Sequence, residues 1–129
     1  MALTKTARTV VASQSRTPGG APVRGRLDLN AAQGGGFLTI KMTNGATAPA
    51  VQCSCNILIA HNAILPAAAS AGADWKTIAS YGGGTVANYP TEIGIPIDPS
   101  IMCLEVEFTG NTLQAVTVEA YLSELTAVA

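Results

Sequence analysis

Residues 102–108 read Met-Cys-Leu-Glu-Val-Glu-Phe, in which large apolar residues alternate with cysteine and glutamate. Successive side chains of a β-strand point to opposite faces of its sheet. A period of two therefore predicts a strand with one face in the core and the other in water. Glu105 and Glu107 then lie on the outer face. The inner face carries Met102, Leu104, Val106 and Phe108.

The same alternation recurs in three more segments, which are residues 38–42, 51–59 and 116–122. One face of the second segment holds Val51, Cys53, Cys55, Ile57 and Ile59. Fainter strand patterns cover residues 4–13, 23–29, 75–81 and 85–97. The last of these contains two prolines, which suit an edge strand because proline cannot donate to a ladder of hydrogen bonds. No segment shows a sustained apolar stripe of helical period.

Glycine-rich turn signals separate these segments. Gly110-Asn111, between two strong strand patterns, predicts a tight hairpin with a type I′ or II′ turn. About eight strands in 129 residues predict an all-β protein, either a single-domain antiparallel β-sandwich or a jelly roll. Residues 1–21 are less patterned and are expected to form an N-terminal arm ahead of a β-sandwich domain at 22–129. Such an arm could add a strand to a neighbour's sheet.

The charges are few and unevenly distributed. Only 12% of the residues are charged, against about 25% in typical soluble domains. Six of the seven basic residues lie in the first 41 positions, and seven of the eight acidic residues lie after position 73. This split predicts a dipolar molecule that works by contact with other polypeptides. The residues expected at such contacts are Lys5, Arg8, Arg16, Arg24, Arg26, Trp75, Tyr81, Tyr89, Glu105 and Glu107.

Candidate catalytic groups are scarce. His61 is the only histidine, so any Ser-His-Asp or Cys-His site would need it. Glu105 and Glu107 would lie about 6.5–7 Å apart along one strand, which overlaps the spacing of an inverting glycosidase. Alternate outward carboxylates are more often a solvent face, and here they could pair with Arg24 or Arg26 of another subunit. The sequence therefore predicts no enzyme and no small-molecule substrate.

No cofactor or metal is expected. The glycine runs at 34–36 and 82–84 lack a Walker ending. Cys53 and Cys55 share a face with apolar neighbours, which favours core packing over a disulfide or a Cys₃His zinc site. Cys103 lies on the opposite face from Leu104 and is expected to be accessible. Trp75 could be a core anchor or an exposed interface residue.

Two classes of partner are not expected. A pI near 5.7, without a basic stripe, argues against nucleic acid. The longest apolar stretch, residues 57–73, is interrupted by His61, Asn62 and Pro66, which argues against a membrane span. The first residues lack the apolar region of a secretory signal, so synthesis in a cytoplasm is expected.

Several segments together resemble the small structural proteins of tailed-bacteriophage virions. They are Gly25-Arg-Leu-Asp-Leu29, the run from Phe37 to Pro49 and the run from Phe108 to Ala120, within residues 22–122. The resemblance implies a capsid decoration (cement) protein, which is a β-sandwich or jelly-roll module. It further implies a homotrimer that binds the major capsid protein, stabilises the head shell, is assembled in the host cytoplasm and is located in the virion.

Three alternatives remain open from the sequence. One is a structural protein of the neck, tail, baseplate or fibre attachment. Another is a module that binds glycans or a host surface through aromatic residues of 75–89. The last is a hydrolase that uses His61 or the pair of glutamates.

Overall fold

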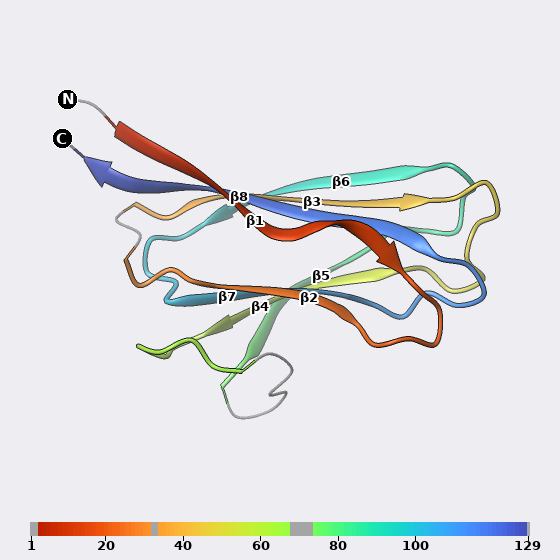
Figure 1. The fold of residues 1–129 in the computed structure, drawn as a ribbon, viewed down its shortest axis with the longest axis horizontal. Coiled ribbons are helices and arrows are strands. Elements are labelled where there is room, and N and C mark those ends of the chain that lie inside the picture. Colours follow the sequence, from red (N-terminus) through yellow and green to blue (C-terminus); the bar gives the residue numbers. More distant parts are fainter. Residues whose placement is uncertain (1–2, 32–33, 68–73, 129) are drawn as a thin grey trace.

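The computed structural model describes residues 3–31, 34–67 and 74–128 and contains eight strands and no helix within them. Two four-stranded antiparallel sheets lie face to face, with the chain ends side by side at one end of the molecule (Figure 1). The strands are β1 (Leu3–Arg16), β2 (Val23–Asp28), β3 (Gly36–Asn44), β4 (Ser54–Ala60), β5 (Lys76–Gly82), β6 (Pro90–Ile97), β7 (Cys103–Thr109) and β8 (Val116–Val128). The all-β sandwich predicted from the sequence is confirmed.

The strand order identifies the sandwich as a jelly roll. The first sheet has the order β1-β8-β3-β6, and the second sheet has the order β2-β7-β4-β5. Four antiparallel pairs join β1 to β8, β2 to β7, β3 to β6 and β4 to β5. The first half of the chain therefore lies against the second half in reverse order, as in one long hairpin that has been rolled up. This is the double-sheet arrangement of a jelly roll.

The apolar alternation of the sequence lines the space between the sheets. Fully buried side chains come from both central pairs, and they include Leu38, Ile40, Met42, Cys53, Cys55, Ile57, Leu104, Val106, Phe108, Val116, Val118 and Ala120. Two assignments at strand starts were wrong. Val51 precedes β4 and is 54% exposed, and Met102 precedes β7 and packs outside the main core.

Gly25 marks the point where the two sheets come closest. It lies on the inner face of β2, between the inward residues Val23 and Leu27. A Cβ at this position would be 1.8 Å from the carbonyl oxygen of Val10 in β1. Only a residue without a side chain permits this approach of one backbone to another, so Gly25 closes the sandwich at this edge.

A second, smaller core lies on the outer face of the second sheet. Residues 61–67, which follow β4, lie over this face, where Ala60, Trp75 and Cys103 are buried with Leu65 against them. The indole Nε1 of Trp75 donates to the carbonyl of Ala67 at 3.0 Å. The prediction of an accessible Cys103 was wrong for this reason. The prediction of a solvated Glu105 was also wrong, because Arg24 of the neighbouring β2 lies against its carboxylate and leaves it no exposed surface.

Two further expectations differ from the structure. Residues 3–16 of the expected N-terminal arm form β1, which pairs with β8 of the same chain over its length. Gly110 and Asn111 do not form a tight hairpin, because β7 and β8 belong to different sheets and residues 110–115 cross between them. Asn111 is buried in this crossing, and its side-chain nitrogen donates to the carbonyls of Arg16 and Gln114.

Candidate interaction surfaces

The uneven charge of the sequence is largely neutralised within the fold. Each early strand pairs with a late one, so the early cations meet the late anions across the ladders. Arg8 of β1 contacts Glu124 of β8 at 3.3 Å, and Lys41 of β3 contacts Glu92 of β6 at 3.1 Å. Arg24 of β2 binds two carboxylates of β7, as described below. Three of the early cations are therefore paired with late anions within the chain, because the first half of the chain lies against the second half in reverse order.

Arg24 joins the two glutamates that the sequence offered as a catalytic pair. Its guanidinium contacts Glu105 at 3.0 Å and also contacts Glu107. Glu107 accepts a further hydrogen bond from Asn56 at 2.7 Å. The Oε2 atom of Glu105 is buried and has no hydrogen-bond partner among the described residues. This intrachain network occupies the carboxylates that were expected to pair with another subunit.

Few of the residues expected at contacts are exposed. Arg16, Trp75 and Glu105 are buried, and Tyr81 is half-buried against the main core. Arg8, Arg24 and Glu107 are engaged in the ion pairs above. Lys5, Arg26 and Tyr89 remain at the surface, and Arg26 donates to the carbonyl of Pro66. The hypothesis of glycan binding through aromatic residues of 75–89 relied mainly on Trp75, but this side chain is only 4% exposed.

The other chemically interesting side chains are separated from one another. His61 is exposed just after the end of β4, as the sequence predicted. Cys53 and Cys55 are fully buried, as expected, and all three cysteines are unpaired thiols. Burial raises the pKa of Cys53 to about 11 and also raises that of Cys55, so both thiols are protonated at neutral pH. Among the described residues, no group of three or more His, Cys, Asp or Glu side chains could hold a metal ion. The same part of the chain has no helix able to cross a membrane.

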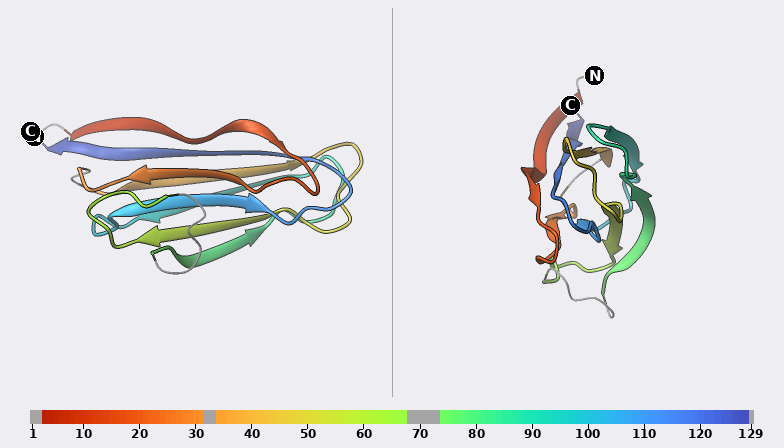
Figure 2. Two further views of the ribbon diagram at one scale, coloured as in Figure 1. Left: turned by 60° about the horizontal axis from the view of Figure 1, so that its bottom comes forward. Right: turned by 90° about the vertical axis from the view of Figure 1, so that its right-hand side faces the viewer.

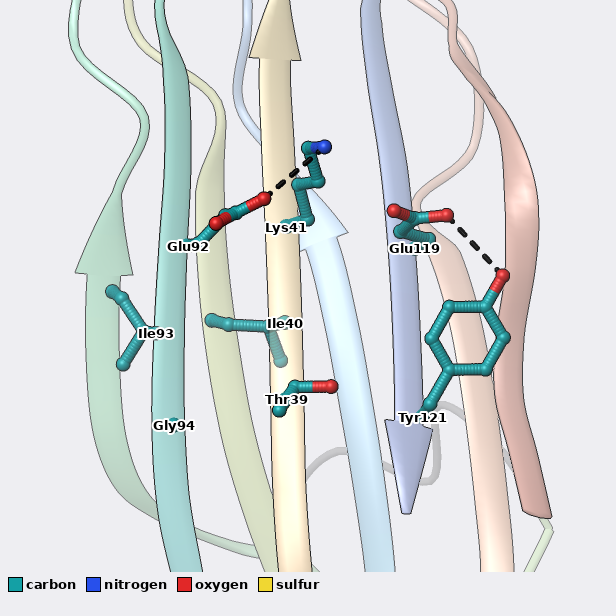
Figure 3. Close-up of a pocket in the computed structure, with 8 residues that line it drawn as sticks. All are labelled: Thr39, Ile40, Lys41, Glu92, Ile93, Gly94, Glu119 and Tyr121. Atoms are coloured by element: carbon teal, nitrogen blue, oxygen red, sulfur yellow. Dashed lines mark hydrogen bonds and ion pairs between the residues drawn. The ribbon is translucent and has the colours of Figure 1, made fainter. Parts of the chain in front are cut away.

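The outer face of the first sheet is exposed along its four strands and is mostly uncharged. Its outward side chains alternate with the buried Leu38, Ile40 and Met42 and are mostly threonine, serine, alanine and proline. The Lys41–Glu92 ion pair and the neighbouring Glu119 carry the charge at its centre. A depression of about 340 Å³ lies between these groups and Tyr121 (Figure 3).

Two exposed aromatic rings belong to this face. Phe37 is 49% exposed, and its ring lies over Gly94 of the adjacent strand, where a Cβ would be 2.7 Å from the ring. Tyr121 is 41% exposed, and its hydroxyl donates to Glu119 at 3.2 Å. Partial burial and this hydrogen bond raise the pKa of Tyr121. The face therefore offers apolar area in a polar, weakly charged surround, which is typical of protein interfaces. Strand alternation predicted its polarity, but only the sheet order shows which strands share it.

A second exposed surface lies at the end of the molecule opposite the termini. Four connections meet there, at residues 17–22, 45–53, 83–89 and 110–115, and we name them together the loop end (Figure 2). Four large apolar side chains are exposed on it, which are Val51, Val86, Tyr89 and Leu113. The sequence singled out Tyr89 as a contact residue, whereas it placed Val51 and Val86 in strand patterns and Leu113 in a turn segment.

Comparison with known proteins assigns this chain to no family. No protein-family model matches it, and no curated protein matches it. Among solved structures, a chain from "Structure of infectious bursal disease virus Gx strain" is 13% identical with a TM-score of 0.45. The alignment covers 95% of this chain and 32% of that chain, so this protein spans about a third of its length. A likeness this distant carries no information about function.

Proposed function

We propose that the protein is a structural component of a virion, and specifically a capsid decoration (cement) protein that stabilises the head shell. Its partner would be the major capsid protein, and its role would be contact without catalysis, cofactor or nucleic acid. The sequence resemblance described above points to this class of protein. The observation that carries the proposal is the outer face of the first sheet, where exposed Phe37 and Tyr121 lie among mostly uncharged polar residues.

The size of this face indicates how it would bind. Four strands about 4.8 Å apart and nine residues of about 3.4 Å rise give an area on the order of 500–600 Å². A stable one-to-one complex buries about 800 Å² on each partner. One copy would therefore hold a shell weakly. Several linked copies on a lattice would bind with the high avidity that repeated contacts provide, which suits a homotrimer.

Binding to isolated shells tests the proposal. The variant Thr39→Lys places a charge at the centre of the face, on an exposed side chain. We expect it to fold normally and to lose shell binding at least tenfold. The control Thr77→Lys adds the same charge to an exposed position of β5 in the other sheet and should bind like the wild type. Equal binding by both variants would exclude this face as the docking surface.

The number of copies per particle distinguishes a decoration protein of the head from a component of the neck or tail. Quantitative mass spectrometry of purified particles should find the chain in numbers comparable to the capsomers of the shell, and imaging should place it on the outside. A few copies at one vertex would instead favour the neck, tail, baseplate or fibre-attachment role.

The depression on the same face favours glycan binding as a second candidate function. Exposed Tyr121 adjoins it, and Glu92, Glu119 and Lys41 supply hydrogen-bonding groups around it. Binding to a glycan array that is lost in Tyr121→Ala would support this function in place of shell binding. An array without signal for the wild type would reject it.

A further inference from the structure

The loop end has no ionisable Asp, Glu, Lys, Arg or His side chain in any of its four connections. These connections contain 28 residues, in which about three charged residues would be expected at the 12% found in the whole chain. Exposed protein surface that contacts only water usually carries charge, which keeps molecules apart in solution. The lack of charge is therefore a property of this end, and it sets the loop end apart from the opposite end of the molecule.

The exposed apolar side chains of the loop end are concentrated and fixed in place. Leu113 is 77% exposed, Val86 is 62% exposed and Val51 is 54% exposed. Backbone hydrogen bonds join the connections to one another, from Ala50 to Thr112, from Thr112 to Val51 and from Asn88 to Gly45. A surface held in this way loses little conformational freedom when it is covered, so it is ready for binding.

Leu113 is the most informative of these residues. Its backbone has a φ of 68°, in the left-handed region that residues other than glycine seldom adopt. The strained backbone does not serve to bury the leucine, because most of its side chain is in water. The turn is held by the backbone amide of Gln114, which donates to the carbonyl of Thr112 at 2.8 Å, and by Asn111, whose side chain donates to the carbonyl of Gln114. The leucine is therefore presented to solvent from a fixed backbone.

Arg16 fixes the base of the loop end. Its guanidinium is buried and donates to the carbonyls of Thr17, Gly20 and Asn111, which belong to two different connections. No carboxylate contacts it among the described residues. The positive charge of Arg16 is thus buried beneath the loop end and is not part of its exposed surface.

We propose that the loop end is a self-association surface, at which copies of this chain meet around a rotational axis. Near such an axis each side chain approaches its own copies, so any charge there would repel itself. A charge-free apolar surface avoids this repulsion and gains from burial. The loop end has no charge to complement that of a different partner, whereas the outer face of the first sheet carries Lys41, Glu92 and Glu119 for such a contact.

This inference rests on the homotrimer of the proposed function and names its contact surface. Self-association is measured without any shell, so its failure is distinguishable from a failure of shell binding. The full-length chain should form oligomers in analytical ultracentrifugation at high concentration. Leu113→Lys, which places a charge near the axis in every copy, should be monomeric and folded under the same conditions. The matched control Ile64→Lys changes an apolar residue that is 83% exposed and lies outside the loop end. It should remain oligomeric.

Cross-linking detects the contact even when it is weak. Leu113→Cys should form intermolecular disulfides under mild oxidation at least tenfold faster than Ile64→Cys, because only position 113 lies at the proposed contact. The three native thiols are buried, so they add no background in either variant. Equal rates for the two variants would overturn the proposal. So would oligomers that survive in Leu113→Lys. Loss of shell binding in Thr39→Lys, with cross-linking at position 113 unchanged, would show that the two surfaces act separately.

Discussion

Replacing Arg24 by methionine should be among the most damaging single changes to an ion pair in this protein. The guanidinium lies 3.0 Å from Glu105, whose side chain has no exposed surface and whose second oxygen already lacks a partner. Removing one partner of a buried pair typically costs about 3–5 kcal/mol, because it leaves a buried charge uncompensated.

We expect the Arg24→Met variant to lose about 3–4 kcal/mol of unfolding free energy relative to the wild type. The loss is large because Glu105 has no exposed surface and its other carboxylate oxygen has no partner among the described residues, so water does not replace the guanidinium.

Equilibrium unfolding in urea, followed by the fluorescence of buried Trp75, measures these differences. The double variant Arg24→Met with Glu105→Gln removes the buried charge and should recover most of the loss. Lys41→Met is the matched control, since its pair with Glu92 is exposed and should contribute less than about 1 kcal/mol. A loss below about 1 kcal/mol for Arg24→Met, or a loss that Glu105→Gln does not relieve, would refute the reasoning.

Three further changes test the packing. Gly25→Ala should prevent the two sheets from closing and lower the thermal midpoint by more than any exposed Gly→Ala change, because its Cβ would meet the carbonyl of Val10; a normal midpoint would contradict this account. Trp75→Ala should cost about 3–5 kcal/mol and make the thiol of Cys103 reactive to an alkylating reagent, whereas an unreactive thiol would show that the second core survives without the indole. Stability should fall above pH 9, by about 1.4 kcal/mol at pH 10 for Cys53, because its thiol has a pKa of about 11 when folded and ionises sooner when unfolded. Cys53→Ala should reduce that slope, and a slope equal to that of the wild type would assign the effect to other groups.

The candidate surfaces show where sequence reasoning could not succeed. The loops of the loop end are separate turn-rich segments in the sequence, and nothing local indicates that Leu113 and Val51 lie in hydrogen-bonded neighbours. The face around Tyr121 and Phe37 depends on β8 lying beside β3, which are far apart along the chain. Trp75 could be an anchor or a ligand platform by sequence alone. Its burial follows from residues 61–67, which lie over the outer face of the second sheet.

The sequence by itself determined the strands and the inner face of most of them. The period-two pattern at 102–108, and its repeats at 38–42 and 116–122, place apolar side chains on one side wherever one face of a sheet is buried. Only the tertiary structure decided what the other side meets. Glu105 reads as solvated in the alternation, yet it is buried beneath Arg24 because β2 lies next to β7. The basic and acidic residues lie in different parts of the sequence, but several of them form ion pairs in the fold. Local alternation does not specify these pairs, because they depend on strands that are far apart along the chain.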